Sequence, residues 1–187
     1  MSQTPVTWKE TRARLREDRA RLRTYIERDG APRPFLIALY PSYACVLMHR
    51  ISHYFWRRGW HRLGRLIWHL NMVVTGADIG PVSNLGPGLL VPFPAAVSIY
   101  GTAGRHLTCM PLSGLGGELG RDEDVGAGPG LPHLGDGVTL GHHAGVLGPV
   151  RIGNRVRLGP GCIVASDLED DASVEPAPIR QLKGRVA

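Results

Sequence analysis

Leu134-Gly-Asp-Gly-Val-Thr139 and Leu140-Gly-His-His-Ala-Gly145 begin a series of seven six-residue units that runs without interruption to Glu175. Six of the seven units open with an aliphatic residue, and four of these aliphatics are followed by glycine. One inward aliphatic residue in every six is typical of a parallel β-helix, in which three units complete a triangular coil. We therefore predict that each leading aliphatic stacks on the one three units away, so that the stack forms a continuous core.

The same period begins before this series. Earlier units are residues 79–84, 85–90 and 91–96. The pattern is irregular through residues 97–112, where Ile99, Leu107 and Cys109 are nevertheless predicted to face inward. Residues 114–132 are rich in glycine and have no six-residue pattern, so we predict that they form one loop excluded from the coil.

The chain before the repeats has a helical character. Residues 5–28 consist of strong helix formers and are followed by Asp29-Gly30, which predicts a helix that ends there. Residues 35–74 carry apolar residues at spacings of three and four, which predicts two helices broken near Gly59, the second over residues 60–74. The predicted organisation is a helical region over residues 1–75 followed by a β-helix over residues 76–187, an α+β fold.

Composition narrows the class of protein. The chain has 187 residues, 43% hydrophobic content and a net charge of +6, which is compatible with one domain or one domain plus a helical appendage. The longest apolar run is too short to span a bilayer, and residues 1–30 do not resemble a secretory leader. Three cysteines, an odd number without metal-type spacing, predict a reducing cytoplasm and no disulfide framework, and we expect no metal.

Residues 1–30 contain eight Lys or Arg residues and five acids. This charge is compatible with a nucleic-acid or membrane surface, but no nucleic-acid motif accompanies it. The favoured interpretation is a solvated helix face with internal pairs such as Glu17 with Arg21. We therefore expect neither a nucleic-acid nor a membrane partner.

Several segments of the chain resemble the serine O-acetyltransferase family. They are Tyr40-Pro-Ser-Tyr43, Met48-His-Arg-Ile-Ser-His53, Thr75-Gly-Ala-Asp-Ile79, Leu85-Gly-Pro-Gly-Leu-Leu90, Leu115-Gly-Gly117 and Glu175-Pro-Ala-Pro178. The resemblance extends over nearly the whole chain from about residue 8. It implies an N-terminal helical segment followed by a left-handed parallel β-helix, with acetyl-CoA as the acyl donor. It also implies a homotrimer with sites between subunits, and hexamers formed through the helical region.

The catalytic pair of that family is not retained. In the family an Asp-His pair follows the Gly-x-x-aliphatic segment, and its His is the general base on the serine hydroxyl. Pro92 and Phe93 stand at those positions. Asp78, fifteen residues before Phe93, matches the family's orienting Asp, which holds the imidazole in the correct tautomer. Because Phe cannot accept a proton, the family's mechanism cannot run here unaltered.

A second departure lies in the loop. The family has an Arg-His-Pro there that helps to hold the serine carboxylate, and Gly130-Leu131-Pro132 occupies that place. His133 follows directly and substitutes for the missing His only if the loop is rearranged. The two departures together predict that no productive serine site is present.

The thioester side of the resemblance is better retained. Gly116 and Gly117 match the family's glycines, and Arg157 stands at a Lys position that would pair with a phosphate. His142 and His143 occupy positions that are small in the family. They would either crowd the pantetheine arm of coenzyme A or place an imidazole beside the substrate.

Each candidate also has an ordinary structural explanation. The His142-His143 pair lies at a coil corner, where side chains usually face solvent, and His106 lies at a position that tolerates any polar residue. Asp78 after a helix is compatible with a simple turn cap. His49 and His53, four residues apart on a helix, are better explained by packing than by metal binding.

The favoured hypothesis is an acyltransferase on the serine acetyltransferase frame, using acetyl-CoA or another acyl thioester, with a small-molecule acceptor other than serine, in specialised metabolism. In it, His133, His142 or His143 is the base, Asp78 a support, and Pro92, Phe93 and His106 contact the acceptor. An inactive trimeric scaffold is the alternative. A third hypothesis is a different reaction on a thioester or a substrate bound to an acyl carrier protein, with Asp78 as the acid or base.

Overall fold

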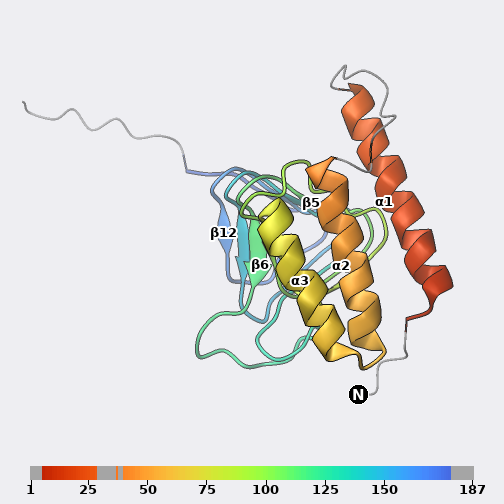
Figure 1. Ribbon diagram of the computed structural model, residues 1–187. Helices are drawn as coiled ribbons and strands as arrows, with labels where there is room; N and C mark the ends of the chain where they lie inside the picture. Colours follow the sequence, from red (N-terminus) through yellow and green to blue (C-terminus); the bar gives the residue numbers. More distant parts are fainter. Residues whose placement is uncertain (1–5, 29–36, 38–39, 178–187) are drawn as a thin grey trace, which may run out of the picture.

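A computed structural model describes residues 6–28, 37 and 40–177. Its helices are α1 (Trp8–Arg28), α2 (Pro41–Arg57) and α3 (His61–Thr75). α2 and α3 are antiparallel neighbours on either side of Gly59, whose φ of +83° favours glycine (Figure 1). The two predicted helices and the break near Gly59 are therefore confirmed, whereas the parts of the helix predictions that fall on residues 5, 29–36 and 38–39 lie outside the described residues.

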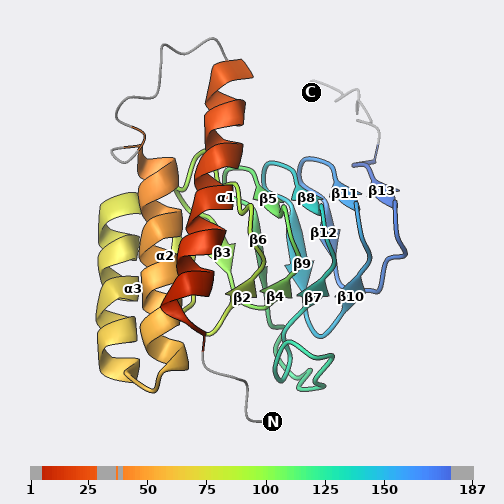
Figure 2. The same cartoon turned by 90° about the vertical axis from the view of Figure 1, so that its right-hand side faces the viewer.

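The described residues after α3 wind into a left-handed parallel β-helix whose strands are two or three residues long, and the predicted β-helix over residues 178–187 lies outside the described residues. The first sheet contains β1 (Asp78–Ile79), β3 (Ser98–Ile99), β6 (Gly114–Gly116), β9 (Gly145–Leu147) and β12 (Ile163–Val164). The second sheet contains β2 (Asn84–Leu85), β4 (Thr102–Ala103), β7 (His133–Leu134) and β10 (Arg151–Ile152). The third sheet contains β5 (Thr108–Cys109), β8 (Thr139–Leu140), β11 (Arg157–Leu158) and β13 (Ser173–Val174). The three helices lie at the end of the β-helix where the first coil begins (Figure 2).

The predicted stacking of the repeats is confirmed. Ile152 pairs in register with Leu134, Leu158 with Leu140, and Val164 with Val146, so each residue lies on the one three units earlier. All six side chains are buried, as are Ile99, Leu107 and Cys109 in the irregular stretch. Burial of one such side chain stabilises the fold by ~1.5–3 kcal/mol, so the central stack is the main source of stability.

Two details of the repeat prediction are wrong. Gly114–Gly116 does not belong to the loop: it is strand β6, paired with β3 and β9, because Leu115 continues the inward stack. The last coil is shorter than the pattern of six requires. Leu168, rather than Asp170, pairs with Ile152, since the apolar side chain packs on the core while Asp170 stays exposed and accepts the backbone N–H of Asn154.

Two arginines of α1, Arg14 and Arg21, bind the β-helix, whereas Arg12, Arg16, Arg19, Arg23 and Arg28 are exposed, as predicted for a solvated helix face. Arg14 donates to the carbonyl of Leu85, and Arg21 donates to the carbonyl of Leu107 and to Thr108 Oγ1. The predicted pair of Glu17 with Arg21 is therefore wrong: Glu17 accepts from Arg105 at 2.7 Å. The carbonyl of Leu107 also accepts the backbone N–H of Leu90, so Arg21 uses the second lone pair of that oxygen. None of the described helices is both apolar and long enough to cross a membrane.

Candidate active site

Asp78 lies at the start of the first sheet and is held by two side chains that the sequence did not indicate. Its Oδ1 accepts a hydrogen bond from the indole N–H of Trp68 on α3 at 2.8 Å and from the hydroxyl of Tyr100 at 2.7 Å. Burial, followed by the hydrogen bond to Asp78, raises the pKa of Tyr100. The phenol is therefore a proton donor to the carboxylate over the physiological pH range.

Neither Trp68 nor Tyr100 was among the predicted site residues. Tyr100 is the residue directly after β3, and Gly80 is the residue directly after β1. Because β1 and β3 are paired in register, residues 80 and 100 are neighbours on adjacent coils. A Cβ at residue 80 would lie 2.7 Å from Cε1 of Tyr100, so the ring covers Gly80. The presence of a glycine directly after Asp78-Ile79 was the signal for this close approach.

Pro92 and Phe93 lie in the turn that leads to β3. Pro92 is buried, and its carbonyl accepts the hydroxyl of Ser42 at the start of α2. Phe93 is 55% exposed and lines a cavity of about 550 Å³ between the helices and this turn. Asp78 does not line this cavity. Within one chain, the carboxylate is therefore bonded to Trp68 and Tyr100 rather than to a group at position 93.

A groove of about 570 Å³ runs over the first sheet. Gly116, Gly117, Tyr100 and His143 all line it. Its lining combines small residues, such as Ser98, Gly114 and Gly145, with larger apolar ones, such as Leu147 and Ile163. A side chain at Gly114 would come within 2.8 Å of the Ser98 carbonyl oxygen. A groove of this kind accommodates a narrow chain such as a pantetheine arm, which is the chemistry that the resemblance assigns to Gly116 and Gly117.

His143 has an unusual backbone conformation. Its φ is +57°, in the left-handed region that non-glycine residues seldom adopt. His143 lines the groove from this corner, whereas neighbouring His142 does not line it, and both residues are exposed. Of the two histidines, the structure therefore brings only His143 to the groove.

The other predicted site residues lie elsewhere in the chain. His133 is on the second sheet, between Thr102 and Arg151, and its buried Nδ1 has no hydrogen-bond partner among the described residues. Arg157 is exposed on the third sheet, away from Gly116 and Gly117. Within one chain these two side chains do not meet the groove.

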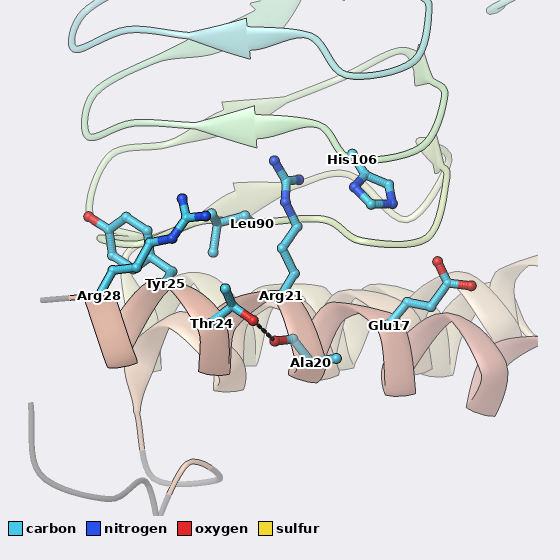
Figure 3. A pocket seen from close by; sticks show the side chains of 8 residues that line it. All are labelled: Glu17, Ala20, Arg21, Thr24, Tyr25, Arg28, Leu90 and His106. Atoms are coloured by element: carbon cyan, nitrogen blue, oxygen red, sulfur yellow. Dashed lines mark hydrogen bonds between the residues drawn. The ribbon is translucent and has the colours of Figure 1, made fainter.

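His106 lies on the far side of the first coil from the groove. It lines a second cavity, of about 480 Å³, against α1 (Figure 3). Figure 3 shows Arg21, Arg28 and Glu17 projecting from α1 into the same space. This cavity is charged, in contrast to the one beside Phe93, with which it shares Tyr25. His106 therefore lies in a different cavity from Phe93, although both residues were predicted to contact the acceptor.

Comparisons with known proteins agree with this architecture. Residues 132–166 match the family model for the bacterial transferase hexapeptide (six repeats). The chain is 34% identical to a serine acetyltransferase of Synechococcus elongatus over 86% of its own length and 66% of that protein's length, so it spans slightly less than two thirds of this relative. It is 32% identical to the serine acetyltransferase of Mycobacterium tuberculosis, covering 86% of this chain and 69% of that one.

The same similarity is found among solved structures. The crystal structure of Neisseria gonorrhoeae serine acetyltransferase superposes with a TM-score of 0.80 and 26% identity, covering 95% of this chain and 70% of that chain. The helical segment and the β-helix are thus both part of the shared fold.

Proposed function

Because this chain belongs to the serine acetyltransferase family, we propose that it is an acyltransferase whose acceptor is not serine. The proposal depends on Phe93, which stands at the position of the family's base and has no group that takes a proton. The relatives are named as serine acetyltransferases, and this supports the proposal that the chain is an acyltransferase. The proposal that the acceptor is not serine rests on this chain's own residues.

The donor is proposed to be acetyl-CoA, bound along the groove over the first sheet. Its narrow arm would lie over Gly116 and Gly117. Transfer breaks the bond between the carbonyl carbon and sulfur, joins that carbon to an oxygen or nitrogen of the acceptor, and releases the free thiol. The proton lost by the acceptor is the one that the departing thiolate takes up.

His143 is proposed as the base that carries this proton. Of the described histidines, it is the one that lines the groove, and histidine is the side chain most often used as a general base. Tyr100 lines the groove, and its hydroxyl donates a hydrogen bond to Asp78. Asp78 is therefore proposed to hold the Tyr100 ring in place at the start of the groove.

A homotrimer is proposed as the assembly. Exposed apolar side chains support it: Leu66 and Val73 on α3, and Leu147 and Ile163 on the first sheet. In a trimer the second and third sheets of one chain face its neighbours, which is how His133 and Arg157 would reach a groove. Assembly of trimers into hexamers through the helices is proposed on the family resemblance alone.

Two measurements test this function. Calorimetric titration with acetyl-CoA should show saturable binding, and thiol release should then depend on an uncharged alcohol or amine more than on L-serine. Replacing His143 by Asn, which tolerates the left-handed backbone, should lower kcat by roughly 10²–10⁴-fold if His143 is the base. His142→Asn is the matched control and should leave kcat unchanged.

The alternatives predict different results. Efficient turnover of serine would contradict the proposed acceptor. Binding of acetyl-CoA without thiol release for any acceptor would indicate an inactive scaffold. Absence of acetyl-CoA binding, together with activity on a carrier-bound thioester, would indicate that the donor is bound to an acyl carrier protein.

A further inference from the structure

The cavity beside Phe93 is formed by α1, the start of α2, the end of α3 and the turn before β3. Its lining residues are Leu22, Tyr25, Ile26, Tyr40, Pro41, Ser42, Val74, Thr75, Pro92, Phe93, Pro94 and Ala95. No charged side chain is among these described residues. At about 550 Å³ it falls within the range of ~300–1,000 Å³ that is typical of small-molecule sites.

Two hydroxyl groups of the lining are already engaged within the protein. Ser42 donates to the carbonyl of Pro92, and Thr75 donates to Asn71 on its own helix. A zwitterion such as serine would therefore bring two charges into a space where none of the described lining side chains carries the opposite charge. Transferring charges from water into such surroundings is strongly unfavourable.

Phe93 connects this cavity with the proposed reaction. The ring is more than half exposed although it belongs to an apolar wall, so apolar surface is available for a ligand to cover. Pro92 and Phe93 also stand where the related enzymes have the catalytic pair that acts on the acceptor. The space next to them is therefore the acceptor's side of the site.

We propose that this cavity binds the acceptor through an uncharged aryl or alkyl body, and that Phe93 is a specificity-determining residue. The inference rests on the proposed acyl transfer, since it is that reaction which requires an acceptor. It goes further by stating the class of molecule: an alcohol or amine attached to an apolar body, rather than an amino acid.

The test is binding without a donor, so that catalysis plays no part. The probe is 2-phenylethanol, titrated into the full chain and followed by saturation-transfer NMR, with L-serine as competitor. Saturable binding that L-serine does not displace is expected. Phe93→Asp should weaken binding about tenfold or more, because it places a charge in the apolar wall. Val82→Asp should leave binding unchanged, since Val82 is an exposed apolar residue that does not line the cavity.

Three results would overturn the inference: no saturable binding, displacement of the probe by L-serine, or equal weakening by Phe93→Asp and Val82→Asp. Chemical unfolding of both variants identifies a loss of folding, and in that case Phe93→Ser replaces Phe93→Asp with the same expected direction. The proposed acyl transfer fails separately. Probe binding without thiol release would contradict the proposed acyl transfer but support the proposed specificity of the cavity. Turnover without probe binding would support acyl transfer and contradict the proposed specificity of the cavity.

Discussion

The hydroxyl of Tyr100 reaches Asp78 because residue 80 has no side chain. A Cβ at that position would come within 2.8 Å of two atoms of the Tyr100 ring, closer than real contacts allow. The same carboxylate oxygen also accepts the indole N–H of Trp68. One oxygen of Asp78 therefore accepts hydrogen bonds from two separate elements, α3 and the segment after β3. These two bonds orient the carboxylate, and no imidazole takes part in them.

Removing the phenol hydroxyl tests this arrangement. Tyr100→Phe should lower the free energy of unfolding by ~1.5–3 kcal/mol, the usual contribution of a hydrogen bond to a charged group. Gly80→Ala should destabilise as well, because the new methyl group displaces the ring. Guanidinium unfolding measures both changes. Tyr54→Phe is the control, since the Tyr54 hydroxyl only accepts from Arg58 at the surface; a loss as large as that of Tyr100→Phe would contradict the argument.

At the scale of elements, a buried ion pair holds α1 against α2 and the first coil. Arg50 donates from Nε to Asp18 Oδ2 at 2.9 Å and from Nη2 to Asp18 Oδ1 at 3.1 Å, and both side chains are 1% exposed. Arg50 also donates to the carbonyls of Leu85 and Gly86, and Asp18 accepts the backbone N–H of Leu89. Every charged atom that faces inward therefore has a partner, which is the condition for tolerating buried charge.

Breaking this pair should be costly. Asp18→Asn leaves the Arg50 guanidinium buried without its counter-charge and should lower the free energy of unfolding by ~3–5 kcal/mol. The exposed pair of Arg23 with Glu27 on the same helix offers the matched control. Glu27→Gln should have no measurable effect, since solvent screens an exposed pair. Equal stability of the two variants would show that α1 is not held by the ion pair.

At the scale of the whole molecule, His49 and His53 lie between the helices and the β-helix. His49 is 1% exposed, and burial, followed by the charges of Arg50 and His53, holds its pKa well below the usual value. The Nδ1 of His53 lies 2.9 Å from the carbonyl of Pro81, and burial lowers the pKa of His53 to about 4. Both rings are therefore neutral in the folded protein at neutral pH.

This burial predicts that acid destabilises the fold. Below the ordinary pKa of 6.5 the unfolded chain takes up a proton at His53, whereas the folded chain does not until the pH approaches 4. The unfolded state then binds more protons, so stability is complete above pH 6.5 and falls as the pH decreases through this window. His53 alone should account for about 2 kcal/mol lost by pH 5. Urea unfolding at pH 7 and pH 5 should show a smaller loss for His53→Gln; an unchanged loss would exclude His53 as a source.

The β-helix was predictable from sequence because each coil contacts only its neighbours, so its period is written directly in the chain. Leu134, Leu140 and Val146 and their partners three units later followed this period. The pattern failed at Asp170, where the last coil is two residues shorter and Leu168 takes the inward place. It also failed for Glu17, since a helix pattern does not show which of its faces will dock on another element.

Sequence alone determined the coil and the helices before it, and it led to the prediction that Phe93 stands in place of the family's base. Only the tertiary structure decided that Tyr100 and Trp68 hold Asp78, that His143 but not His142 lines the groove, and that the described side chains around the space beside Phe93 are uncharged. The physical reason is the range of the interactions. The repeat is a local property of consecutive residues, whereas the site joins groups from separate helices and coils whose proximity is set by how the helices pack on the first coil.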